Sequence, residues 1–369
     1  MYALSIVHGI LAIAFLLDNR NISRGVFFLF SVTVVIIFGI FYGFRDYSSG
    51  TDSYVYAAAY ESGDFQLWEP GYVLWLRFLR LFGEGYQVYF AVGTFLKLAL
   101  LVLSAHNVSK VVGYSLGALF LLLVLYTFTL FDLYTNGLRQ GLAMTVAILG
   151  ASFYFCGRGR LALAVSVLAP FFHLSYLPYV FSYLTALFCR ASSAARYLLL
   201  AFSSLSSISI FVGLNWFALV KPVLLDMGSY IGIANKIAYY SELTKGSFLS
   251  LNMNGQLKVL IILSMSLLAL AILNRSKSTF DQFLVVIVSI LILLYGLVAH
   301  LAYSYRFIYL VTSLSPFVVV CVVRFLRARL ENKFISRSVS ALSLLIAMVN
   351  YCYFVVIGGG LSGFKYFSN

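Results

Sequence analysis

Charged residues are scarce in this chain. Asp, Glu, Lys and Arg make up only 10% of its 369 residues, whereas hydrophobic residues make up 62%. Soluble domains carry about 25% charged residues, so this composition excludes a soluble globular protein. Apolar runs of the roughly 20 residues that cross a bilayer follow one another along the chain. The sequence therefore predicts an all-α polytopic membrane protein of about ten transmembrane helices, the first over residues 2–17, that forms one integral membrane domain over residues 1–369.

Cysteine and the common cofactor motifs are also scarce. The four cysteines lie far apart in apolar surroundings, and their spacing indicates neither a metal site nor a disulfide framework. Asp-x-Asp, His-Glu-x-x-His, Walker and glycine-rich nucleotide motifs do not occur. We therefore expect no metal, no cofactor and no nucleotide donor.

Acidic residues are outnumbered, 12 against 25 Lys and Arg, which leaves a net charge of +13. Many of the basic residues lie in short connectors between apolar runs, as cytoplasmic loops of membrane proteins do. The excess is therefore an orientation signal rather than a nucleic-acid surface. It predicts that both termini and residues 45–85 and 217–255 are external. Lys97, inside an apolar run, is expected to extend its ammonium toward the cytoplasmic surface.

One apolar segment does not fit a single crossing. Residues 161–188 are about 28 long, contain Pro170 and Pro178, and have basic residues at both ends. Two short helices that meet near His173, as a broken hairpin entering and leaving from the cytoplasm, satisfy both the length and the charge rule. A backbone break at that depth is tolerated only where it lines a cavity or is buried in protein.

The stretch 45–72 concentrates carboxylates, one arginine, hydroxyls and aromatic rings between apolar runs. That mixture suits a polyhydroxylated, partly anionic ligand, although an ordinary solvated loop with an aromatic belt would look similar. An external interfacial helix is expected to start at Pro70, which fits a first helical position. Arg77 and Arg80 would share one face of this helix, with Glu84 four residues beyond Arg80.

Several arginines fall on the predicted external side, against the usual charge bias. They could bind an anion, or each could pair with a nearby carboxylate, as Arg80 with Glu84 or Arg45 with Asp46. His173 could act as a general base or could cap the broken helix.

Four short blocks of the sequence resemble the EpsG-type membrane proteins, which are grouped with the Wzy-type polymerases of bacterial O-antigens, capsules and exopolysaccharides. The blocks are Phe44-Arg45 with Gly50-Thr51-Asp52 and Tyr56, then Glu69-Pro70-Gly71-Tyr72, then Asn136-Gly137-Leu138-Arg139-Gln140-Gly141-Leu142-Ala143, and finally Phe172-His173-Leu174-Ser175. The resemblance covers roughly residues 2–188. The second half is similar only in hydropathy and in Arg306, which opens a late helix.

This resemblance implies a multi-pass polymerase of the bacterial inner membrane whose active site faces the periplasm. It would transfer a growing glycan from undecaprenyl diphosphate to the non-reducing end of a new lipid-linked repeat unit. The implied partners are the undecaprenyl-diphosphate-linked oligosaccharide, the lipid bilayer, and a chain-length regulator and flippase of the same pathway. Nucleic acid is not among them.

The reaction would need cations for the departing diphosphate and a base for the acceptor hydroxyl. The candidates for substrate binding are Arg45, Arg139 and Arg306, then Arg77 and Arg80, with Tyr56 and Tyr72 from the matching blocks. For the catalytic base we rank His173 first, Asp52 second and Glu69 third. Three other classes stay open: an O-antigen ligase, a transporter or flippase of lipid-linked oligosaccharide, and a membrane O-acetyltransferase.

Overall fold

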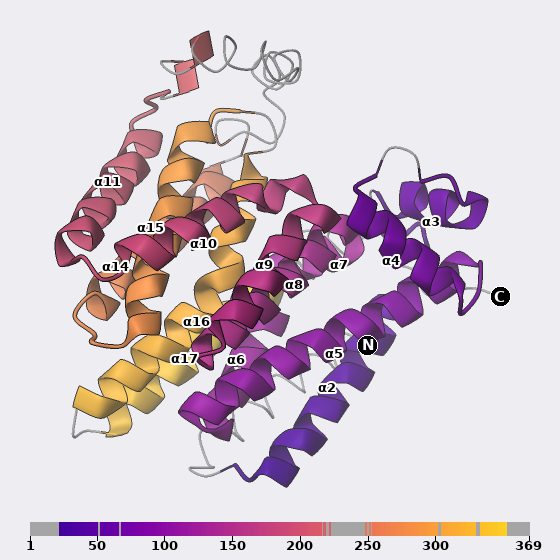
Figure 1. Cartoon of the computed structure of the whole chain (residues 1–369), viewed down its shortest axis with the longest axis horizontal. Helices are drawn as coiled ribbons and strands as arrows, with labels where there is room; N and C mark the ends of the chain where they lie inside the picture. The colour runs from indigo at the N-terminus through magenta and orange to yellow at the C-terminus, as the bar shows by residue number, and fades with distance from the viewer. Residues whose placement is uncertain are drawn as a thin grey trace. The chain divides into compact units, whose positions relative to one another are not determined.

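The protein is seen here in a computed structural model, shown in Figure 1. It describes residues 22–50, 52–65, 68–215, 217–218, 221–222, 248, 251, 253–301, 304–329 and 333–352. The helix expected over residues 2–17 lies outside this part of the chain, as does most of the segment 217–255. The helices gather into two compact units, Met1–Leu177 with Val323–Asn369, and Pro178–Val322.

Every regular element of the described residues is helical. The first unit contains α2 (Arg24–Gly43), α3 (Ser53–Ser62), α4 (Pro70–Arg80), α5 (Tyr86–Val112), α6 (Tyr114–Leu125), α7 (Phe128–Thr135), α8 (Leu138–Phe155), α9 (Gly159–Phe172), the 3-10 turn η1 (Leu174–Tyr176) and α17 (Lys333–Cys352). The second contains nearly all of α10 (Leu177–Cys189), then α11 (Ser193–Phe211), α14 (Met253–Leu273), α15 (Thr279–Val298) and most of α16 (Tyr305–Arg329).

Six of the described helices are long and apolar enough to cross a membrane: α2, α5, α11, α14, α15 and α16. The helices α6 and α7 meet at an angle of 56° and would add a seventh crossing if they form one broken span. These helices confirm an all-helical, multi-pass membrane protein. The expected total of about ten crossings stays a prediction, as do the external placements.

Small residues let the helices of the first unit approach closely. In α8, Gly150 faces Ser166 of α9, and these two helices share one of the largest contacts of the unit. Side by side in Figure 1, α2 and α5 meet where Gly43 faces the backbone of Ala91. Small side chains permit such close packing of membrane helices. As a result, α2 ends directly beside the first turns of α5.

The break predicted inside residues 161–188 is confirmed. Helix α9 ends at Phe172, His173 is extended with φ −160° and ψ 120°, and η1 follows before α10. Pro178 stands in the first turn of α10, where its missing N–H costs nothing. Entry and exit of this segment from the cytoplasm stay a prediction.

The stretch 45–72 is more ordered than a loop. Residues Ser53–Ser62 form α3, which the sequence analysis did not predict, and Gly63 ends that helix in the left-handed conformation with φ 74°. The expected start of a helix at Pro70 is confirmed, and this is α4. Two short helices therefore interrupt this stretch, and most of its charged residues, such as Asp52 and Glu69, lie at the ends of these helices or in the segments beside them.

Candidate functional site

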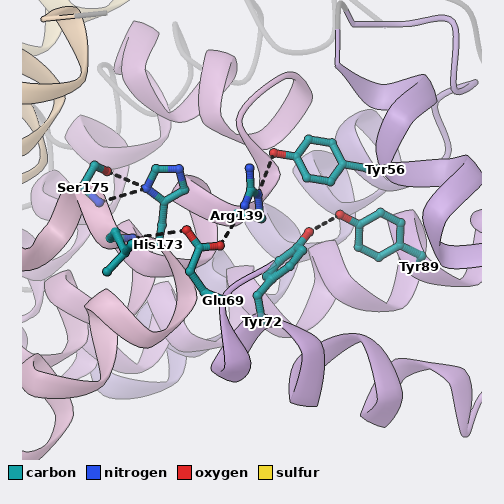
Figure 2. Close-up of polar contacts among 8 residues, drawn as sticks. Tyr56, Glu69, Tyr72, Tyr89, Arg139, His173 and Ser175 are labelled. Atoms are coloured by element: carbon teal, nitrogen blue, oxygen red, sulfur yellow. Dashed lines mark hydrogen bonds and ion pairs between the residues drawn. The ribbon is translucent and has the colours of Figure 1, made fainter. Parts of the chain in front are cut away.

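The four sequence blocks that carry the family resemblance come together in the first unit. At their centre, Arg139 Nη1 donates to Glu69 Oε2 over 2.8 Å, although 70 residues separate the two. Both side chains are largely covered, with 25% and 14% of their surface exposed. Figure 2 shows this ion pair between Tyr56 on one side and His173 on the other.

Two aromatic residues complete the surroundings of Arg139. Its Nε donates to the Tyr56 hydroxyl at 3.4 Å, and its guanidinium carbon lies 5.9 Å from the Tyr56 ring centre and 5.7 Å from that of Trp68. The rings of Tyr56 and Trp68 also contact each other. We call Tyr56, Trp68, Glu69, Arg139 and His173 the outer cluster.

Local packing places Glu69 in this cluster. Glu69 precedes Pro70 at the start of α4, but it makes no capping bond to that helix. Its Oε1 instead lies 3.4 Å from the backbone N–H of Leu174. The close approach depends on Gly71, because a Cβ there would stand 2.8 Å from the carbonyl oxygen of Phe171. A larger residue would push α4 away from the end of α9.

Arg139 owes its position to the turn between α7 and α8. It is the second residue of α8, where the helix dipole disfavours a cation and a nearby carboxylate such as Glu69 offsets that cost. The Ser53 hydroxyl donates to the carbonyl oxygen of Thr135 at 2.7 Å and fastens α3 to this turn. Tyr56, three residues or nearly one turn after Ser53, thereby reaches Arg139.

The ring of His173 has a defined orientation. Its Nδ1 accepts a hydrogen bond from the backbone N–H of Ser175 at 3.2 Å and lies 2.7 Å from the hydroxyl of the same residue. A backbone N–H can only donate, so Nδ1 must offer its lone pair. The neutral imidazole therefore carries its proton on Nε2. In this orientation His173 presents a hydrogen-bond donor, and its basic nitrogen is already engaged.

A second group of polar residues is buried behind the first; we call Arg45, Tyr72, Tyr89 and Lys97 the inner cluster. Arg45 is fully buried, and its Nη1 donates to the carbonyl oxygen of Tyr42. Its guanidinium carbon lies 4.1 Å from the centre of the Phe90 ring. Burial lowers the pKa of Arg45 to about 10, so the side chain is still a cation near neutral pH.

The structure corrects the expectation for Lys97. Only 5% of its surface is exposed, and its Nζ lies 4.1 Å from the ring centre of Tyr134. Side chains of a helix lean toward its N-terminus, and for α5 this is the end where Tyr89 and Phe90 lie. Lys97 therefore points into the inner cluster and does not extend toward the opposite end of its helix.

Tyr72 joins the two clusters. Its ring contacts those of Tyr56 and Trp68, and its hydroxyl forms a hydrogen bond with that of Tyr89, as Figure 2 shows. Burial raises the pKa of Tyr72 well above its usual value. The side chain therefore stays a neutral phenol that can donate and accept but does not act as an anion.

Other predicted site residues lie apart from these contacts. Asp52 is exposed at the start of α3, and Arg77 is exposed in the last turn of α4. Arg80 pairs with Glu84 over 2.7 Å, which is the carboxylate pairing that the sequence analysis offered as the alternative to anion binding. Arg306 is the second residue of α16, in the second unit. Roles of these four residues in the reaction stay predictions.

Taken together, the fold and the clusters define a multi-pass helical membrane protein with a polar site built from several helices. The family model named EpsG matches residues 3–367, so the chain belongs to the EpsG family. Membership gives it a polysaccharide polymerase-type role with glycosyltransferase-like chemistry. The match also extends the resemblance from the first half to nearly the whole chain. Comparisons with curated proteins and with solved structures found no match.

Proposed function

We propose that the protein lengthens a bacterial surface polysaccharide on the periplasmic side of the inner membrane. A growing glycan leaves undecaprenyl diphosphate and joins the non-reducing end of a new lipid-linked repeat unit. A flippase delivers that unit, and a chain-length regulator acts on the same product. The observation that carries the proposal is the outer cluster, in which an Arg–Glu pair and a histidine donor stand beside two aromatic rings.

These residue types suit the binding of a sugar. Tyr56 and Trp68 provide ring faces for the apolar side of a pyranose, while the Arg139–Glu69 pair offers both donors and acceptors to its hydroxyls. Because the two charges of the pair cancel, the outer cluster favours a neutral ligand over an anion. His173 adds a donor at Nε2.

The orientation of His173 changes our ranking of the bases. Nδ1 is occupied and Nε2 carries the proton, so neither nitrogen of the neutral ring is ready to accept one. Glu69 is a carboxylate in the same cluster, and its Oε1 has only a long contact with Leu174. We therefore place Glu69 first as the general base and His173 as a donor that orients the substrate.

The chemical step then balances without further reactants. Glu69 takes the proton of the acceptor hydroxyl, and the acceptor oxygen forms a bond to the anomeric carbon of the donor sugar. The bond from that carbon to the diphosphate oxygen breaks, and its electron pair leaves with the lipid diphosphate. No nucleotide is consumed, because the donor is already an activated glycosyl diphosphate.

Replacing His173 by Asn and by Ala tests whether His173 takes part in the reaction or only caps the turn. Asn keeps an acceptor for the Ser175 N–H, so it preserves the turn, but it lacks the Nε2 donor. We expect both variants to reach the membrane in normal amounts and to leave single repeat units in place of long polymer, measured on polysaccharide gels. Normal chain length in His173→Asn would mean that His173 only caps η1.

The same gels separate the proposed function from its alternatives. Glu69→Gln, made at normal protein abundance, should cause single repeat units to appear on the cell surface. Polymer that accumulates on the lipid carrier would indicate a ligase, and repeat units retained in the cytoplasm would indicate a flippase. Either result would refute the polymerase.

A further inference from the structure

The inner cluster carries positive charge that no carboxylate balances among the described residues lining its cavity. Arg45 and Lys97 border this cavity together with Tyr72, Tyr89 and other uncharged residues. The two basic side chains thus face the same small cavity. Arg139 differs, because Glu69 neutralises it. Buried cations without counter-charges are costly, and in membrane proteins they mark functional positions.

Only part of the Arg45 guanidinium is engaged in hydrogen bonds. Its Nη1 caps the end of α2, whereas Nε and Nη2 are buried and have no hydrogen-bond partner. The ring of Phe90 supports the guanidinium, and the ring of Tyr134 supports the ammonium of Lys97. Aromatic faces hold cations in place without cancelling their charge. The donors of Arg45 are thus left for a ligand, with Lys97 on the wall of the same cavity.

The two phenols add one more donor. Tyr72 and Tyr89 share a single hydrogen bond between their hydroxyls, so one O–H donates to the other and the second O–H is left over. The cavity itself measures about 10 Å³, roughly what one water molecule needs. It therefore admits a single ligand oxygen rather than a whole anion.

We infer that the inner cluster is an anion subsite that takes an oxygen of a diphosphate group, with Arg45 and Lys97 as its cations. This inference rests on the proposed function and divides the substrate between the clusters. The inner cluster contacts one oxygen of the diphosphate, and the outer cluster, which is neutral overall, holds the sugar. Arg139, expected from the sequence to bind the diphosphate, instead serves the hydroxyl-bearing part.

Binding of inorganic pyrophosphate tests the subsite without any polymerase assay. The full-length protein in nanodiscs of neutral lipid is titrated at constant ionic strength, and heat of binding and thermal stabilisation are measured. Arg45→Gln and Lys97→Met should each weaken binding about tenfold or more, because each removes a charged donor. The matched control, Lys110→Met in the exposed last turn of the same helix as Lys97, should bind within about threefold of the wild type, since Lys110 does not line the cavity.

Stability without ligand provides an independent measurement. Lys97→Met removes one of two like charges that are buried together, so it should melt at a higher temperature than the wild type while losing the pyrophosphate effect. A lower melting temperature would make Lys97 a structural residue and would overturn the inference. Arg45→Gln with unchanged pyrophosphate affinity would overturn it too.

The source of the diphosphate is tested by adding a polyprenyl diphosphate to the nanodiscs. Arg45→Gln should weaken binding of this lipid as well as of inorganic pyrophosphate. A preference for the lipid would identify the carrier-linked donor, and equal binding would identify the diphosphate group alone as the ligand. A wild-type protein that binds neither probe refutes the subsite, whereas polymer length tests the proposed function separately.

Discussion

The Arg139–Glu69 pair should stabilise the protein much more than an exposed pair of the same geometry. Two opposite charges about 3 to 4 Å apart attract each other by roughly 4 to 6 kcal/mol at the effective dielectric constant of about 20 found near protein surfaces. The loss of hydration of both groups on burial offsets part of this attraction. For a largely covered pair we expect a net coupling of about 1.5 to 3 kcal/mol.

The chain offers a matched control in Arg80 and Glu84. Their charged atoms are 2.7 Å apart, against 2.8 Å for Arg139 and Glu69, but the Glu84 side chain is 75% exposed, against 14% for Glu69. Exposed pairs four residues apart on or beside a helix couple by about 0.3 to 0.5 kcal/mol. The two pairs therefore have nearly the same geometry but differ in the exposure of the carboxylate and in whether the partners are neighbours in the chain.

Both couplings can be measured by double-mutant cycles. Each carboxylate is changed to Gln and each arginine to Gln, singly and together, and the free energy of unfolding is measured in bicelles by steric trapping. Arg139→Gln should cost more than Glu69→Gln, because it also loses the Tyr56 hydroxyl and two ring faces. A coupling for Arg139–Glu69 no larger than that for Arg80–Glu84 would refute the reasoning.

Two further variants test how the outer cluster is assembled. Gly71→Ala should reduce polymer length and stability, since its Cβ meets the Phe171 carbonyl, whereas Gly25→Ala at the start of α2 meets nothing and should be neutral or slightly stabilising in the same assays. Ser53→Ala should lower the free energy of unfolding by about 1 to 2 kcal/mol, because it leaves the buried Thr135 carbonyl without its hydrogen bond. Thr33→Ala removes an exposed bond within one helix and should change the free energy of unfolding by less than about 0.5 kcal/mol. Equal effects within either pair would contradict the packing described here.

Local signals in the sequence predicted the parts of the site that depend on nearby residues. Pro70 indicated the start of α4, the two prolines around His173 indicated the break, and the four-residue spacing of Arg80 and Glu84 allowed for their pair. Each of these features follows from the backbone or from one helical turn. None requires knowledge of what the segment packs against.

Lys97 shows why the inner cluster was missed. One face of α5 carries Phe90, Gly93, Thr94 and Lys97 at helical spacing. The sequence alone therefore indicates that these side chains lie on the same side of the helix. What that face meets comes from α2, α4 and α7, which are far away along the chain. The ammonium of an isolated lysine in an apolar run can lie either at the membrane surface or in a buried polar site. Only the packing of these helices decides between them.

The same packing places the two clusters on one short helix. Tyr72 and Glu69 are three residues apart at the start of α4, and they serve different clusters. At Gly71, between them, this turn packs so closely against the end of α9 that a Cβ would stand 2.8 Å from the Phe171 carbonyl oxygen. Because both residues extend from one turn that is held by this contact, the backbone of α4 sets the spacing between the proposed diphosphate subsite and the proposed general base.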